Sequence, residues 1–302
     1  MSDRPVRRSY TATMSAMRWF RAVIPVLLLA AAAIRAPMPD ARAGAAVPGF
    51  AHVVIVVEEN RSQADVIGNP SAPYLNQLAA GGAMMAQSFA ETHPSQPNYF
   101  ALFAGSTLGV TDNSCPVNAG NTANLGSQLL GTGRTFMGFA EGLPAVGSTV
   151  CSAGGYARKH APWVNFSNIP PAYSVPFSMF PPPSRPQAYT GLPTVSFVIP
   201  DGNNDMHDGT IAQGDAWLRQ NLAGYAEWAK ANNSLLIITW DEDNNTPRNQ
   251  IPTIFYGAHV RPGTYATPIS HYNVLSTIQE MYRLPKLGLA ARAPAITAIW
   301  DS

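Results

Sequence analysis

Two short apolar segments, each followed directly by acidic residues, constrain the fold of this chain most strongly. Residues 52–57 and 235–240 are largely apolar and rich in β-branched side chains. Runs of this kind are typical of central parallel strands that helices cover on both faces. The carboxyl ends of such strands meet at one edge of the sheet, where α/β proteins hold their ligands. We therefore expect the residues after the two segments to lie together, although about 180 residues separate them.

The residues that follow these two strands carry hard oxygen ligands, which suit a divalent cation. The four candidate ligands are Glu59, Asn60, Asp241 and Glu242. An acidic run after a strand is also typical of a solvated turn, but Trp240 and the apolar run before it place this turn against the core. We predict that the four residues bind one divalent cation and that the next residue, Asp243, faces solvent.

Helical and strand patterns alternate along the chain, which indicates an α/β protein with a mainly parallel central sheet in a three-layer sandwich. The expected strands are 52–57, 84–89, 135–139, 195–199, 235–240 and 251–256, and the expected helices are 73–80, 98–104 and 272–282, with a long helix that begins after Asp208 and ends near 232–233. Asp208 is the predicted N-cap of that long helix. We find no linker that would divide residues 44–302 into two domains.

The first 43 residues have the pattern of a secretory signal peptide. A basic stretch precedes an apolar run at 22–34, and small residues follow at 41–43. The apolar run is shorter than the roughly 20 residues of a spanning helix, so cleavage is favoured over a stable membrane anchor. Removal of residues 1–43 takes away seven Arg and two Asp, which changes the net charge from +1 to −4. We expect a secreted or periplasmic protein that binds no nucleic acid through bulk charge.

Two cysteines, Cys115 and Cys151, lie in long loops rich in Gly, Asn, Ser and Pro. In an exported protein the expectation is one disulfide, and a reactive thiol pair is the alternative. A disulfide here would tie together the loops 105–124 and 142–155, which we expect to be ordered and to cap a site.

Ser95 is the candidate nucleophile. The chain becomes helical soon after it, so its hydroxyl would lie at a helix N-terminus, where backbone N–H groups favour an anion. A serine beside a metal can ionise and attack phosphorus, and Asn98 can donate a hydrogen bond to a phosphoryl oxygen. The alternative is that Ser95 only caps the helix.

Four of the six histidines fall in loops or at strand ends beside other polar residues: His93, His160, His207 and His271. An imidazole titrates in the range that a general acid requires, and His207 or His160 suits the protonation of a leaving alkoxide. His52 and His259 adjoin apolar strands and are expected to be structural.

Several of these residues form motifs that resemble the bacterial phosphoesterase family of acid phosphatases and phospholipases C, within the alkaline-phosphatase-like superfamily. The motifs span residues 59–62, 93–98, 156–160, 204–209, 240–242 and 269–272. The resemblance implies a metal at Glu59, Asn60, Asp241 and Glu242, a nucleophilic Ser95 and a proton-donating His207. It also implies substrate contacts from His93, Lys159, His160 and His271. One departure is that Asp241-Glu242 replaces the Asp-His pair of zinc-rich members, which favours one harder metal or a weak metal dependence.

The resemblance implies an exported acid phosphatase that hydrolyses phosphate monoesters, phosphoinositides among them, through a phosphoserine at Ser95. A phosphodiesterase of phospholipase C type is the alternative within enzymes. A metal-stabilised binding protein that does not turn over its ligand is the alternative outside them.

Overall fold

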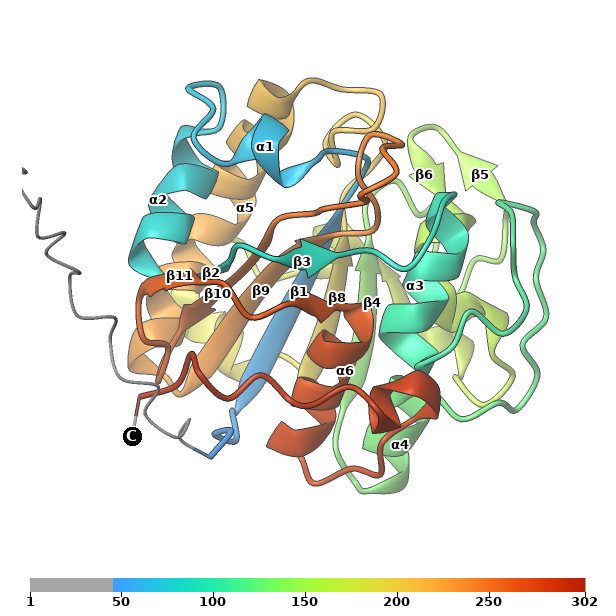
Figure 1. The fold of residues 1–302 in the computed structure, drawn as a ribbon. Helices are drawn as coiled ribbons and strands as arrows, with labels where there is room; N and C mark the ends of the chain where they lie inside the picture. Colours follow the sequence, from blue (N-terminus) through green and yellow to red (C-terminus); the bar gives the residue numbers. More distant parts are fainter. Residues whose placement is uncertain (1–45, 302) are drawn as a thin grey trace, which may run out of the picture. The chain divides into compact units, whose positions relative to one another are not determined.

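The computed structural model describes residues 46–301, so the predicted signal peptide lies outside the described residues. Its central sheet has eight strands in the order β11-β2-β10-β9-β1-β8-β4-β7 (Figure 1). These strands are β1 (His52–Glu58), β2 (Ala83–Met85), β4 (Phe136–Ala140), β7 (Ser174–Pro176), β8 (Val195–Ile199), β9 (Ser234–Trp240), β10 (Thr253–Gly257) and β11 (Gly263–Tyr265). Strand β1 pairs in parallel with β8 and β9, and β10 is antiparallel to both of its neighbours. The predicted mainly parallel sheet is confirmed.

Helices cover both faces of this sheet, as the three-layer prediction requires. The helices are α1 (Gln63–Val66), α2 (Pro73–Gly81), α3 (Ser95–Ala104), α4 (Leu125–Gly131), α5 (Ile211–Ala231) and α6 (His271–Met281), with short 3-10 turns η1 (Arg158–His160), η2 (Pro162–Asn165), η3 (Pro171–Tyr173), η4 (Phe177–Met179), η5 (Pro186–Gly191) and η6 (Gly288–Ala291). Helices α3, α4 and α6 lie on one face of the sheet, and α2 and α5 lie on the other (Figure 1). Alternate residues of β1 point to these opposite faces: Val53, Ile55 and Val57 pack in the cluster on the α3, α4 and α6 side, whereas Val54 and Val56 pack in the cluster on the α2 and α5 side. The alternation explains why β1 is apolar throughout.

Two predicted element boundaries are wrong. The expected strand 84–89 is divided into β2 and β3 (Ser88–Phe89), because the chain turns at 86–87 and β3 leaves the main sheet to pair with β12 (Ile269–Ser270). The N-cap of α5 is Thr210, whose hydroxyl accepts a hydrogen bond from the Gln213 N–H, and not Asp208. A cap must directly precede the first helical residue, and Asp208 lies too far from Ile211.

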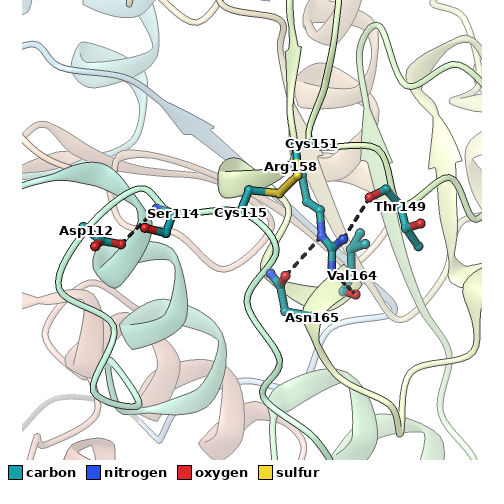
Figure 2. Close-up of a disulfide and its surroundings, with 8 residues drawn as sticks. All are labelled: Asp112, Ser114, Cys115, Thr149, Cys151, Arg158, Val164 and Asn165. Carbon is teal, nitrogen blue, oxygen red and sulfur yellow. Dashed lines mark hydrogen bonds between the residues drawn. A yellow bond between two sulfur atoms is a disulfide. The ribbon is translucent and has the colours of Figure 1, made fainter.

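The predicted disulfide between Cys115 and Cys151 is present (Figure 2). It joins the 105–124 loop to the 142–155 loop, which includes β5 (Ser152–Ala153) and leads into β6 (Tyr156–Ala157). Arg158, which follows β6, supports the Cys151 side: its backbone N–H donates to the Cys151 carbonyl, and its guanidinium donates to Thr149 O at 2.8 Å and to Asn165 Oδ1 at 3.2 Å. Within residues 46–301, no helix combines the length and apolarity that a membrane span requires.

Removal of this disulfide should destabilise the protein substantially. We expect the Cys115→Ser/Cys151→Ser double variant to lose about 3–4 kcal/mol in the free energy of unfolding, because the cross-link closes a loop of 36 residues in the unfolded chain. Urea denaturation measured by circular dichroism gives this difference. The wild-type protein with its disulfide reduced should match the double variant, and an unchanged unfolding midpoint in both would contradict the expectation.

Candidate active site

Ser95 is the first residue of α3, at the carboxyl-end edge of the sheet. The side chain of its N-cap, Pro94, makes no capping hydrogen bond, so nothing from that side chain occupies the start of the helix. Ser95 is only 1% exposed, and its Oγ lies 3.0 Å from Glu59 Oε2 and 3.0 Å from Glu242 Oε1. Ser95 therefore does not act as a plain cap, because its hydroxyl faces two carboxylates rather than a backbone N–H.

Strands β1 and β9 bring these carboxylates together. Glu58 lies opposite Trp240 in the parallel register, so the next residues, Glu59 and Asp241, leave the sheet side by side. The Asp241 N–H donates to the Glu58 carbonyl at 3.0 Å, and the Asn60 N–H donates to Asp241 Oδ1 at 3.4 Å. The structure thus places the predicted residues at one edge of the sheet, but the acidic and histidine ligand atoms that all lie within 4.8 Å of one another belong, in the part of the chain that the structure describes, to Glu59, His160 and Asp205.

A second group of candidate ligands shares Glu59 with the first. Ligand atoms of Glu59, His160 and Asp205 all lie within 4.8 Å of one another, and all three residues are buried. His160 Nε2 lies 3.0 Å from Glu59 Oε1, and His160 Nδ1 lies 3.7 Å from Asp205 Oδ2. His160 was expected to contact substrate, but its burial beneath the site and its stacking on the Tyr99 ring make it a candidate metal ligand instead. Glu59 Oε1 therefore faces His160, a member of this second group, while Glu59 Oε2 faces Ser95.

The charges of the cluster fit a bound cation. Burial, and then Glu59, raise the pKa of Asp205 to about 9. Burial also raises the pKa of Asp241 well above its ordinary value, and the carboxylates of Glu59 and Glu242 add to the effect. Burial acts in the same direction on Glu59, but His160 outweighs it and lowers the pKa of Glu59 to about 2. A divalent cation would stabilise the ionised carboxylates that here repel one another.

Several buried ligand atoms in the cluster have no hydrogen-bond partner, which supports the same conclusion. They are Asn60 Oδ1, Asp205 Oδ2 and Asp241 Oδ2. Buried polar atoms without partners are rare in folded proteins and call for an explanation such as an ion. Carboxylate, amide and imidazole donors together suit a divalent metal.

A cavity of about 420 Å³ opens above Ser95. Its lining includes Asn60, Arg61, His93, His207 and Glu242. His207 is the most accessible imidazole of this group, with 36% of its side chain exposed, and its Nδ1 lies 2.8 Å from Asp208 Oδ1. Nε2 is therefore the nitrogen that His207 can offer to a substrate.

His93 also lines the cavity, but both of its ring nitrogens have partners. Nδ1 is hydrogen-bonded to Glu242 Oε2, and Nε2 lies 3.1 Å from the Thr246 carbonyl. Burial lowers the pKa of His93, but these two acceptors outweigh it, and the net shift is upward. His93 consequently positions Glu242, and a substrate contact would have to compete with these bonds.

Two predicted substrate contacts are not supported by the geometry. Asn98 has all four of its amide hydrogen bonds taken by backbone, since Oδ1 accepts from Glu91 and Thr92 and Nδ2 donates to Thr92 and Pro94. It holds the loop before Ser95 and has no donor left for phosphate. His271 is 1% exposed, and its Nε2 lies 2.9 Å from the Trp240 carbonyl, below the end of β9.

Two further predictions differ from the structure. Lys159 does not line the cavity, although its charge lowers the pKa values of Glu59 and His160. Asp243 was expected to face solvent but is 2% exposed. The chain turns back after it, so that its carboxylate accepts hydrogen bonds from Thr246 and Gln250.

Comparison with known proteins identifies the family. A model described as the phosphoesterase family matches residues 69–285. The chain belongs to the phosphoesterase family. It is 66% identical over 300 residues to the phosphatidylinositol-3-phosphatase of Mycobacterium tuberculosis, a match that covers 99% of this chain and 97% of that protein. An acid phosphatase of Aspergillus fumigatus is 28% identical over 233 residues, which are 70% of this chain and 51% of that protein. The predicted family resemblance is confirmed.

The fold of this phosphoesterase also has relatives among solved structures. A Vibrio parahaemolyticus protein described as a member of the alkaline phosphatase superfamily superposes with a TM-score of 0.56 at 12% identity, over 84% of this chain and 72% of that one. At this identity the match concerns the fold alone, and it confirms the predicted alkaline-phosphatase-like architecture.

Besides His160, which the sequence predicted as a substrate contact, one candidate ligand was not predicted at all: Asp205. It lies in the same 204–209 motif as His207, six residues after β8, and its carbonyl accepts the Glu59 N–H at 2.8 Å. Its place in that motif was a usable signal. The type of residue alone does not identify it, because an aspartate in a polar loop is usually exposed, whereas Asp205 is fully buried.

Proposed function

We propose that this phosphoesterase is an exported, metal-dependent acid phosphatase that hydrolyses phosphate monoesters, phosphoinositides among them, through a phosphoserine at Ser95. The observation that carries the proposal is the environment of Ser95 Oγ, which lies 3.0 Å from two carboxylates at the start of α3. The names of the two relatives above, a phosphatidylinositol-3-phosphatase and an acid phosphatase, support the substrate class. The disulfide fits an oxidising compartment.

The proposed reaction has two steps. Ser95 Oγ attacks phosphorus and gives its proton to Glu242, whose Oε1 lies 3.0 Å away. The ester P–O bond breaks, and the leaving alkoxide takes a proton from His207 Nε2. Water then attacks the phosphorus of the phosphoserine and gives a proton to the neutral His207. The Ser95 Oγ–P bond breaks, and Glu242 returns its proton to Ser95 Oγ, which releases phosphate and restores the enzyme.

A divalent cation held by residues of the Glu59 cluster would lower the pKa of the Ser95 hydroxyl and offset the charge of the phosphoryl group. Glu59, His160 and Asp205 form one candidate ligand set. Asn60, Asp241 and Glu242 can complete it through the other oxygen of Glu59.

A phosphate-release assay on matched esters tests the proposal. The protein should release phosphate from glycerol 2-phosphate and p-nitrophenyl phosphate, and it should be much slower on bis(p-nitrophenyl) phosphate. Trapping with vanadate or a fluorophosphonate should place the adduct on Ser95. A preference for the diester would favour the phospholipase C type of activity, and an adduct on His207 would exclude a phosphoserine route.

His207→Ala should separate substrates by their leaving groups. We expect a loss of about 10²–10⁴-fold in kcat on glycerol 2-phosphate, whose alkoxide needs a proton, and a much smaller loss on p-nitrophenyl phosphate, whose phenolate departs without one. Steady-state kinetics on both esters measure the difference. His259→Ala is the matched control, because that ring bonds Asn233 and does not line the cavity. Equal losses on both esters would assign His207 to phosphate binding instead.

A further inference from the structure

A second, larger cavity of about 1070 Å³ adjoins the one above Ser95. The two cavities share Arg61 and Asn244 in their linings, so Arg61 stands where one meets the other. Residues between 64 and 71 and residues 209–212 form most of the remaining lining of the larger cavity. A leaving group bonded to a phosphate at Ser95 can extend past Arg61 into this space.

Arg61 is the feature of this boundary that points to a ligand. Its guanidinium donates to the Gly209 carbonyl at 3.1 Å and to the Asn60 carbonyl at 3.4 Å. Within residues 46–301, it takes part in no salt bridge. A guanidinium has five N–H donors, so these two carbonyls leave donors for another acceptor. The backbone bonds fix the guanidinium in place without neutralising it.

The charges on the two sides of Arg61 differ. The Ser95 side is acidic, with Glu242 and Asp243 in its lining. The larger cavity contains one carboxylate, Asp65, whose Oδ2 already accepts hydrogen bonds from the hydroxyl and the N–H of Ser62. An anionic group on the substrate would therefore find its available cationic partner at Arg61.

We propose that Arg61 is a specificity-determining residue that binds a second anionic group, a phosphate or phosphodiester, on the leaving group of the phosphomonoester. The inference rests on the proposed function, because it needs the scissile phosphate at Ser95. A planar guanidinium suits this role because it can hold two phosphate oxygens at once. The favoured substrates thus carry two phosphates on one small scaffold, whether free or as a lipid headgroup.

Matched pairs of substrates test this proposal. The first pair is 1,3-propanediol phosphate and 1,3-propanediol bisphosphate, which differ only in the second phosphate. The second pair is glycerophosphoinositol 3-phosphate and dioctanoyl phosphatidylinositol 3-phosphate, which share the second anion and differ in the acyl chains. We expect wild-type kcat/KM to favour the bisphosphate of the first pair by about 10- to 100-fold and to differ little within the second pair.

Variants at Arg61 should then remove the preference. Arg61→Ala should abolish the preference for the bisphosphate, and Arg61→Lys should keep part of it, because lysine retains the positive charge. If Arg61→Ala does not fold, Arg61→Gln takes its place: it retains hydrogen-bond donors but not the charge, so it should also lose the preference. Arg219→Ala is the matched control, because that guanidinium is exposed on α5 and lines neither cavity. We expect the control to keep the full preference.

Three outcomes would overturn the inference. Equal wild-type kcat/KM within the first pair would remove the second-anion site while leaving the phosphatase proposal intact. If Arg61→Ala lowered kcat/KM equally for both substrates of the first pair, Arg61 would bind the transferred phosphate instead. If kcat/KM were much higher for the dioctanoyl lipid than for its deacylated partner, the acyl chains and not a second anion would determine specificity. If wild type releases no phosphate from any of the substrates, the proposed function itself fails, and the inference fails with it.

Discussion

Ser95→Ala should lower kcat on every phosphomonoester by at least about 10⁴-fold, because no other group can take over the covalent step. Ser95 Oγ is the one hydroxyl that contacts both Glu59 and Glu242 among the residues that the structure describes. The substitution removes one oxygen from a buried position, so the fold should persist. Phosphate release and circular dichroism on the same sample measure the two effects.

Ser196→Ala is the matched control for this variant. Ser196 is also fully buried, on β8, and its hydroxyl has no partner. Loss of that hydroxyl should leave turnover within about twofold, since an unpaired buried hydroxyl contributes little to stability. Substantial turnover by Ser95→Ala, with the control unchanged, would show that water attacks phosphorus directly and that the site forms no phosphoserine.

Asp205→Asn should lower both the metal content and the turnover of the protein. We expect turnover to fall by about 100-fold or more, because substitution of groups that only hydrogen-bond to metal ligands already lowers metal affinity or activity by about 10- to 100-fold. Asp205 is buried with an unpartnered Oδ2 beside His160. Metal content can be measured on the purified protein by mass spectrometry, and turnover can be followed as metal is added back. Because the pKa of metal-free Asp205 is raised to about 9, protons and metal compete for it, and metal affinity should rise with pH.

Asp241→Asn, measured in parallel, distinguishes the two candidate ligand sets. A loss of metal only in Asp205→Asn would assign the cation to Glu59, His160 and Asp205. A loss only in Asp241→Asn would assign it to the set that the sequence predicted, with Asn60 and Glu242. Asp112→Asn is the control, because that carboxylate is exposed and bonds the Ser114 N–H. Full metal content and full turnover in both site variants would contradict metal dependence through these residues.

The parts of this protein that could be predicted from the sequence are those set by local pattern. The apolar runs of β1 and β9 identify two buried strands, which deliver Glu59 and Asp241 to the same edge of the sheet. The position of Ser95 at a helix start likewise follows from the residues around it. Parallel strand geometry made this much of the site accessible without a structure.

The errors concern side chains whose partners lie in a loop that folds back on them or on another element. Asp243 is buried because the chain turns back at 244–250, which an acidic run does not reveal. Asn98 faces the backbone at 91–94 rather than the cavity, although its spacing from Ser95 suggested a phosphate contact. His271 packs under the end of β9, far along the chain. In each case the residue type suggested a polar role, but the packing of the folded chain determines what the side chain faces.

The two carboxylate oxygens of Glu59 face different groups, which limits what double-mutant experiments at this residue can show. Oε1 faces His160 and Oε2 faces Ser95, so a single substitution of Glu59 disturbs the nucleophile and the candidate metal ligands together. Effects of residues that act as one unit do not add, and a double variant at Glu59 and Ser95 would be about as active as the less active of the two single variants. Epistasis at Glu59 therefore cannot tell the two roles apart. The roles separate at Asp205, whose carboxylate lies beside His160, but not at Glu242, which contacts Ser95 and is itself a candidate ligand.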